Sequence, residues 1–320
     1  MNDYRSYFSL YDKSPLVQLI ISMFIVLIFG MLLLTLMYLA GTIIFGIDTA
    51  TLSDNLLAGA GETNINFLRY LVFMQDTCLF LLPGLIILFL LKPAHDKSAV
   101  YLRLPRINEI VLVIILAFCL FPITSFAGEL NSGMHLPGWL SEVEKWMVEK
   151  EEDAYKLINL LIVSDTIWIM LLNLLMIAFL PAISEELIFR GVFQKIFYGF
   201  FKTGHPAIWI TAIIFSALHF QFFGLIPRFI LGLVFGYLYF WSGTLWLPVI
   251  AHFVNNAVPV LGEYIKGADY VISQPEVAFW EQAIGLPVPI IVGVLILWYF
   301  RNKSKADPEK DLNQSGVIDV

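Results

Sequence analysis

The run from Thr166 to Tyr198 reads TIWIMLLNLLMIAFLPAISEELIFRGVFQKIFY. It is apolar almost throughout, yet Glu185, Glu186 and Arg190 interrupt it. About 20 apolar residues cross a bilayer as a helix, so the run predicts a membrane span with these three ionisable side chains inside it, while Lys195 lies near its end. Such residues are costly inside a membrane and usually face a cavity or a partner. This run therefore predicts a membrane helix with a function.

The composition of the whole chain agrees with a membrane protein. Its 320 residues are 59% hydrophobic and only 14% charged, whereas a soluble domain is about 25% charged. No basic stripe of the kind that binds nucleic acid is present, so we expect no nucleic-acid partner. Membrane lipid is the first partner that the composition implies.

Apolar runs of spanning length recur along the sequence, and they predict an all-α fold. We expect a polytopic membrane helix bundle of about eight transmembrane helices around an intramembrane polar cavity. The predicted spans are 15–46, 67–91, 108–127, 166–198, 205–222, 226–241, 244–264 and 281–300. We divide this single membrane domain into a three-span region (1–165), a four-span catalytic core (166–264) and a last span with a tail (265–320).

Lys and Arg residues indicate the orientation of the bundle. Most of them fall in the loops on the side of the N-terminus, so the positive-inside rule predicts cytoplasmic N- and C-termini in a plasma (inner) membrane. Segment 138–158 alternates apolar residues at helical spacing with acids. It predicts an amphipathic helix on the outer membrane surface, and both simple packing and a substrate-gating role remain open for it.

Polar residues also interrupt other predicted spans, and their depths can be compared. At 1.5 Å per residue, Glu185 and His219 both lie roughly 21–23 Å from the turn that joins their spans. In the next hairpin, His252 and Asn256 lie roughly 14 and 20 Å from the turn. We therefore expect these four residues to share one layer. Asp76 has no partner by spacing and is left outside the predicted site.

Spacing along each helix predicts how the polar residues divide their roles. Glu186 and Arg190 are four residues apart, with the acid first, which favours an ion pair on one face. Glu185 points about 100° away from that pair and stays free of it. His252 and Asn256 share a face for the same reason.

The chemistry that fits this set is peptide hydrolysis. Glu185 would take a proton from a water molecule as general base. An Asn amide or an imidazole could stabilise the oxyanion that forms on the scissile carbonyl. Glu185, His219 and His252 would also suit Zn²⁺ if a metal is used, although no HExxH motif is present.

Three motifs support this interpretation through a resemblance. Glu185-Glu186-Leu-Ile-Phe-Arg190 matches EExxxR, Phe215-Ser-Ala-Leu-His219 matches FxxxH, and His252-Phe-Val-Asn-Asn256 matches HxxxN. In this order they resemble the CPBP intramembrane proteases, the family that includes the type II CAAX prenyl endopeptidases and the bacterial "Abi" proteins. The resemblance covers about residues 170–260.

The resemblance implies an endopeptidase whose substrate is a membrane-associated or prenylated CAAX-like protein or peptide. It implies that Glu185 and His219 position and activate water, that His252 and Asn256 form the oxyanion site, and that Glu186 and Arg190 support them. Both a metal-dependent and a glutamate-dependent mechanism remain open. So do two alternatives without hydrolysis, namely a membrane scaffold or immunity protein and a proton-coupled transporter.

Overall fold

The computed structural model describes residues 9–47, 62–91, 103–267 and 279–305. All regular secondary structure within these ranges is helical, which confirms the all-α fold. Five helical segments are long and apolar enough to cross a membrane: Pro15–Phe45, Ile65–Leu90, Ile107–Ser132, Ile167–Phe201 and Leu225–Ser242. The chain is therefore an integral membrane protein. The number of eight spans and the three-part division stay predictions.

The helices follow one another with π-helical turns inside several of them. The first two long segments are α2 (Pro15–Phe24), η1 (Ile25–Phe29) and α3 (Gly30–Phe45), then α5 (Glu62–Asp76), η2 (Thr77–Leu81) and α6 (Leu82–Leu90). Next come α7 (Ile107–Ser132), η4 (Gly138–Leu140) and α8 (Ser141–Ile162). The last described helices are α12 (Gly204–Ala217), α13 (Leu225–Ser242), α14 (Trp246–Lys266), α16 (Phe279–Gly285) and α17 (Pro287–Lys305).

The helix that contains the two adjacent glutamates is continuous from α9 to α11. It comprises α9 (Ile167–Asn173), η5 (Leu174–Phe179), α10 (Leu180–Glu186), η6 (Leu187–Phe193) and α11 (Gln194–Phe201). Pro181 lies in the first turn of α10, directly after the π-helical turn. Proline lacks the N–H of a regular turn, and a change of helix type is one way to accommodate it. A second π-helical turn begins right after Glu186.

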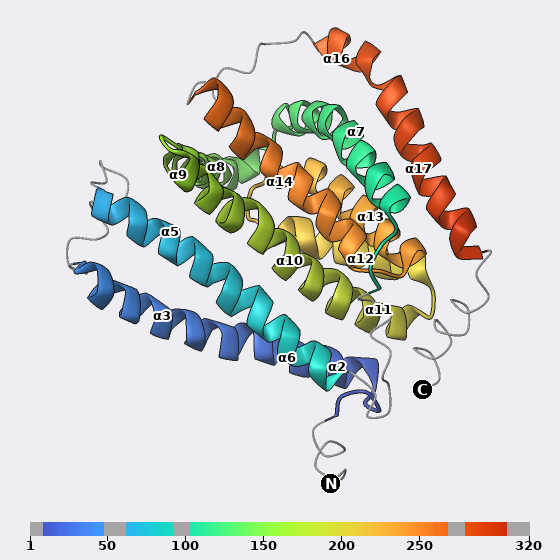
Figure 1. Cartoon of the computed structure of the whole chain (residues 1–320), viewed down its shortest axis with the longest axis horizontal. Coiled ribbons are helices and arrows are strands. Elements are labelled where there is room, and N and C mark those ends of the chain that lie inside the picture. The colour runs from blue at the N-terminus through green and yellow to red at the C-terminus, as the bar shows by residue number, and fades with distance from the viewer. Residues whose placement is uncertain (1–8, 48–61, 92–102, 268–278, 306–320) are drawn as a thin grey trace.

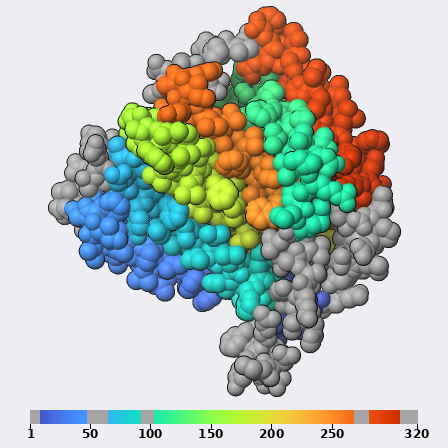
Figure 2. Space-filling view, in the orientation of Figure 1, coloured from blue at the N-terminus to red at the C-terminus, as the bar shows by residue number. Residues whose placement is uncertain are grey.

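This long helix occupies the middle of the bundle. Figure 1 shows α3 and α5 along one edge and α17 along the other, with α9–α11 and α14 between them. On the face drawn in Figure 2, α3, α5, α9–α11, α14, α7 and α17 lie next to one another in that order. The central position agrees with burial, because 39% of the most apolar window of Ile167–Phe201 is buried, against 11% for Pro15–Phe45. The first segment therefore presents most of its surface to lipid.

The prediction for span 205–222 was wrong at its C-terminal end. Helix α12 stops at Ala217, and His219 lies in the turn that follows. The next residue, Phe220, has a φ of 51°, in the left-handed region that ends helices but is unfavourable for a bulky side chain. His219 is therefore held by a turn, which we name the 218–224 turn after its residues.

Helices α12 and α13 pack closely because α13 presents two glycines to its neighbours. A Cβ added at Gly232 would lie 3.0 Å from Ala212 Cβ and 3.1 Å from Ala212 Cα. At Gly236 it would lie 2.8 Å from Ile208 Cγ2. The two glycines are four residues apart, the small-xxx-small pattern that lets membrane helices approach each other. The backbone carbonyls of Gly232 and Gly236 also accept hydrogen bonds from side chains of the helix that contains the two glutamates.

Helix α8 confirms the helix expected over 138–158 and extends it to Ile162. Trp139, in η4, is 81% exposed, whereas Trp146 packs its ring 5.6 Å from that of Phe222. Part of the apolar face of α8 thus contacts the bundle at the 218–224 turn. Its position at the outer membrane surface stays a prediction.

The glycine packing generates a prediction for stability. Gly232→Ala should lower the free energy of unfolding by about 1–2 kcal/mol, because the added methyl meets the backbone of α12 and overpacking outweighs the gain in helix propensity. Gly128→Ala is the matched control, since the new Cβ would meet its nearest neighbour, Pro227 Cγ, at an ordinary 3.6 Å. Thermal unfolding of the purified proteins in detergent compares the two. Equal stability of both variants would contradict the close packing.

Candidate active site

Glu186 is the centre of the buried polar cluster. Its side chain is fully buried, and one oxygen, Oε1, accepts two hydrogen bonds from different helices. Arg190 Nη1 donates to it at 3.0 Å and His252 Nδ1 at 2.9 Å. The first contact is the ion pair expected from the four-residue spacing, and the second connects α10 to α14. Glu186 therefore binds the histidine as well as the arginine.

Arg190 is fully buried and is surrounded by aromatic rings and a backbone carbonyl. Its guanidinium carbon lies 4.8 Å from the ring centroid of Phe215 and 5.6 Å from that of Phe235, which is cation–π geometry. Its Nη2 donates to the carbonyl of Gly232 at 3.2 Å. Gly232 thus takes part both in helix packing, through its missing side chain, and in the hydrogen bonding of a buried charge, through its carbonyl.

Gln194 repeats this arrangement one turn later. Its Nε2 donates to the carbonyl of Gly236 at 3.2 Å, just as Arg190 donates to that of Gly232. Both pairs have the four-residue spacing, so two polar side chains on one helix meet two carbonyls on another. Sequence reasoning missed Gln194 and both glycines, although the spacing of Gly232 and Gly236 was a usable signal.

His252 presents its second nitrogen to Glu185. A carboxylate oxygen only accepts hydrogen bonds, so the proton between Glu186 and His252 belongs to Nδ1. Nε2 then faces Glu185 Oε2 across 3.9 Å, too far for a direct hydrogen bond. The imidazole is also stacked on Phe235, with ring centroids 5.3 Å apart. These contacts fix both the orientation and the tautomer of the ring.

Glu185 is the group in this cluster that is buried without a strong partner. Its side chain is 12% exposed, and Oε2 is buried with no hydrogen-bond partner among the described residues. Glu186 Oε2 and Arg190 Nε are orphaned in the same way. Buried polar atoms without protein partners are usually satisfied by water. The cluster therefore leaves three buried polar atoms, one of them on Glu185, without a hydrogen bond from the described residues.

His219 approaches the same place from the 218–224 turn. Its Nδ1 donates to the carbonyl of Phe215 at 2.8 Å, which leaves Nε2 as the outward nitrogen. The Phe215 ring lies between the imidazoles, with centroids 5.0 Å from His219 and 6.1 Å from His252. His219 interacts electrostatically with Glu185 and with His252. Five of the predicted residues, from two helices and a turn, thus lie together.

Two further polar residues remain, one expected in the site and one left outside it. Asn256 is half-buried one turn after His252, and its Oδ1 accepts from Asn255 Nδ2 at 3.3 Å. Asp76, which the sequence left outside the site, is buried and interacts electrostatically with Glu185. Helix α10 packs against both α5 and the π-helical turn that follows Asp76. Spacing could not reveal this, because α5 contains no other acidic or basic residue near Asp76 in sequence.

A zinc site was one expectation from Glu185, His219 and His252. Within the described ranges, no group of three or more His, Cys, Asp or Glu side chains is arranged to hold a metal ion. One nitrogen of each imidazole is already bonded to a protein oxygen. That leaves Nε2 free on both rings, the arrangement usual for histidines that bind a metal. The ligand set stays a prediction, and we derive no step through a metal.

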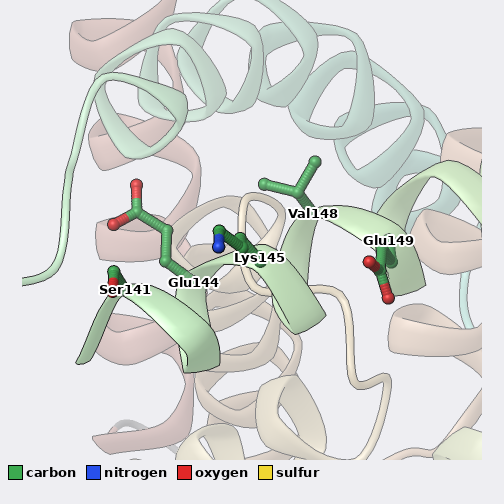
Figure 3. A pocket seen from close by; sticks show the side chains of 5 residues that line it. All are labelled: Ser141, Glu144, Lys145, Val148 and Glu149. Atoms are coloured by element: carbon green, nitrogen blue, oxygen red, sulfur yellow. The ribbon is translucent and has the colours of Figure 1, made fainter.

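A hollow of about 420 Å³ lies on α8 rather than at this cluster. Figure 3 shows its lining by Ser141, Glu144, Lys145, Val148 and Glu149, all from one helix. Two acids and one lysine at the surface are explained by solvation. We assign the hollow no role in the site.

The fold and the cluster define an integral membrane protein whose buried site joins two carboxylates, an arginine and two imidazoles. Comparison with known proteins agrees with this class. Residues 166–258 match the family model described as type II CAAX prenyl endopeptidase Rce1-like. This match confirms the resemblance expected from the three motifs, and it contains every residue of the predicted site.

One relative and the solved structures complete the comparison. The chain is 33% identical over 90 residues to the uncharacterized protein YpbD of Bacillus subtilis (strain 168). The aligned part is 27% of this chain and 43% of that protein, so less than half of the relative is spanned. No solved structure matches the chain significantly.

Glu186 Oε1 is the acceptor shared by Arg190 and His252, so we expect loss of its carboxylate to have a large effect on stability. Glu186→Leu should lower the free energy of unfolding by about 3–5 kcal/mol, because it leaves the buried Arg190 uncompensated. The matched control is Glu152→Leu, which breaks an exposed ion pair with Lys156 at the same spacing and should change stability by about 0.5 kcal/mol or less. Thermal unfolding in detergent measures both. A similar small effect in the two variants would show that Glu186 is not the centre of the cluster.

Proposed function

We propose that this protein is an intramembrane endopeptidase in which Glu185 activates the attacking water. The observation that supports this most directly is the buried Oε2 of Glu185, which receives no hydrogen bond from the described residues and faces His252 Nε2 across 3.9 Å. A gap of this length between two polar atoms accommodates a bridging water. The match of residues 166–258 to the type II CAAX prenyl endopeptidases supports the same reaction class.

The proposed reaction begins with this water. Glu185 removes a proton from it while its oxygen attacks the scissile carbonyl carbon, which gives a tetrahedral intermediate with a negative oxygen. His219 helps Glu185 to position the water through Nε2, the nitrogen not bonded to Phe215. As the intermediate collapses, the C–N bond breaks and Glu185 returns the proton to the leaving amine. Atoms and charge balance without any further reactant.

The oxyanion needs donors, and α14 supplies them in this proposal. In its imidazolium form His252 donates from Nδ1 to Glu186 and from Nε2 toward the reaction centre. The amide of Asn256, one turn further along the same face, adds a second donor. Glu186 and Arg190 support the site by fixing His252 and its helix.

The substrate in this proposal is a membrane-associated or prenylated CAAX-like protein or peptide. The description of the matching family supports this class, and the buried site favours a substrate that is itself anchored in lipid. We further propose a plasma (inner) membrane location with cytoplasmic termini, on the basis of the Lys and Arg distribution alone.

The proposal predicts that Glu185→Gln abolishes cleavage, because an amide cannot accept the proton of the attacking water. We expect a loss of at least about 100-fold. The measurement compares peptide termini in the membrane proteome of cells that express wild type or Glu185→Gln at matched abundance. Termini that appear with wild type alone would identify the substrate, and a farnesylated CAAX peptide and its unmodified counterpart would then test whether the lipid is required.

An unchanged set of termini would contradict the proposed activity. If Glu185→Gln also retained the physiological role of the protein, the scaffold alternative would be favoured. Correct insertion of the variant must be verified by its thermal unfolding, since Gln is close to Glu in size and should leave the fold intact.

A second prediction tests the oxyanion donors. Asn256→Ala should slow cleavage by about 10²–10³-fold, the usual cost of one oxyanion donor, with little change in stability. Asn255→Ala is the matched control: it removes the hydrogen bond that Asn256 Oδ1 accepts but leaves the amide N–H groups of Asn256 in place, and it should matter less than tenfold. Equal losses in the two variants would remove Asn256 from the proposed oxyanion site.

A further inference from the structure

The 218–224 turn, which contains His219, is held by residues that lie outside the matched region 166–258. From α7, Asn131 Nδ2 donates to the carbonyl of Phe222 at 3.0 Å, and its Oδ1 accepts from the N–H of Ile226 at 2.8 Å. From α8, Glu151 Oε2 accepts from the N–H of Phe223 at 3.3 Å. Side chains from two separate helices thus hydrogen-bond to the backbone of this turn and of the residues just after it.

A third contact comes from the start of α13. The guanidinium of Arg228 donates to the backbone carbonyl of Gln221 and to its side-chain oxygen. Gly224 leaves room for this, because a Cβ there would overlap Arg228 Nη1. Arg228 also interacts electrostatically with Glu151 and with Glu185. Arg228, which helps to hold the turn, therefore also acts electrostatically on Glu185, the candidate base.

The turn needs such support because its backbone is strained. Phe220, directly after His219, has a φ of 51°, which is rare for a bulky residue. Conformations of this kind persist only where the surroundings determine them. Release of the contacts should let the turn relax and move the imidazole of His219.

Glu151 is the most unusual of the three supports. It is an acid on an amphipathic helix whose other acids are largely solvated, yet its exposure is only 6%. Burial raises the pKa of its carboxyl, and the hydrogen bond from Phe223 and the charge of Arg228 act in the opposite direction. Burial of an acid is costly, and the oxygen of Glu151 accepts a hydrogen bond from the backbone of this turn. Together these facts indicate a specific role for α8.

We propose that Glu151 is a positioning residue: it fixes the 218–224 turn through the N–H of Phe223 and so holds His219 against Glu185. This inference rests on the proposed hydrolytic function and gives α8 a part in it. A misplacement of about 1 Å at a reacting group can slow a reaction by about 10²-fold. The hydrogen bond should therefore affect the rate of cleavage much more than the stability of the fold.

Three variants at this position separate hydrogen bonding from charge. Glu151→Gln keeps an acceptor oxygen and removes the charge. Glu151→Asp keeps the charge and withdraws the acceptor by one methylene. Glu151→Leu removes both. We expect near wild-type cleavage in the Gln variant, a clear loss in the Asp variant and a loss of about 10²-fold in the Leu variant. Glu152→Leu, one residue further along and exposed, should cleave as wild type does.

Two measurements are made on the full-length chain. Hydrogen exchange followed by mass spectrometry on the segment 218–226 of the purified protein in detergent reports the amide of Phe223. Exchange should be faster in the Asp and Leu variants and unchanged in the Gln and Glu152→Leu variants. The rate at which Glu185-dependent termini appear in membranes reports cleavage, at matched abundance. If the Glu151→Leu variant does not accumulate in membranes, the comparison of the Glu151→Asp and Glu151→Gln variants still tests the positioning role.

The outcomes distinguish the two proposals. Wild type without any Glu185-dependent terminus overturns the proposed hydrolysis, and the role of Glu151 falls with it. Active wild type together with a Leu or Asp variant that cleaves equally fast overturns the positioning role alone. Unchanged exchange in those variants also overturns it, because the turn would then be held without Glu151.

Discussion

The structure depends on the burial of one carboxylate, that of Glu186, between the guanidinium of Arg190 and the imidazole of His252. Glu186 cannot remain charged inside a membrane bundle without partners, and neither can Arg190. One oxygen of Glu186 satisfies Arg190 on its own helix and His252 on another. Because these contacts join α10, η6 and α14, the electrostatic requirement also fixes which helices lie side by side.

Helix packing and charge burial meet at the same glycines. Association of helices in lipid gains little from the hydrophobic effect and depends on close packing. Gly232 and Gly236 permit that packing against α12 and turn their carbonyls toward Arg190 and Gln194. A side chain at either position would collide with α12, through Ala212 or Ile208. The support of the buried arginine is thus part of the backbone architecture.

Sequence reasoning succeeded where the relevant distance runs along one helix. The pairing of Glu186 with Arg190 follows from 3.6 residues per turn, and the length of the apolar runs is enough to predict a helical membrane protein. It missed particular contacts between helices. The bond from His252 to Glu186 joins residues 66 positions apart, and the proximity of Asp76 to Glu185 depends on how α5 packs.

The end of α12 shows a second limit of predictions that rest on runs of apolar residues. An apolar run predicts a helix through His219, but the chain leaves the helix at Ala217 and turns. What stabilises the turn is not local: Asn131 and Glu151 precede it by some 70 to 90 residues. A single-sequence pattern contains no signal for such contacts, because an acid on an amphipathic helix is usually solvated.

The two adjacent glutamates end up in opposite situations for a geometric reason. Successive residues on a helix point about 100° apart, so a helix can direct one carboxylate toward an arginine and a histidine and leave the other without a hydrogen bond from them. Glu186 receives two hydrogen bonds and orients a histidine, whereas Oε2 of Glu185 receives none from the described residues. Glu186 fixes His252 through Oε1, and His252 in turn faces Glu185. The same short segment therefore builds the support of the site and its candidate base, which explains why both charges occur inside an apolar run.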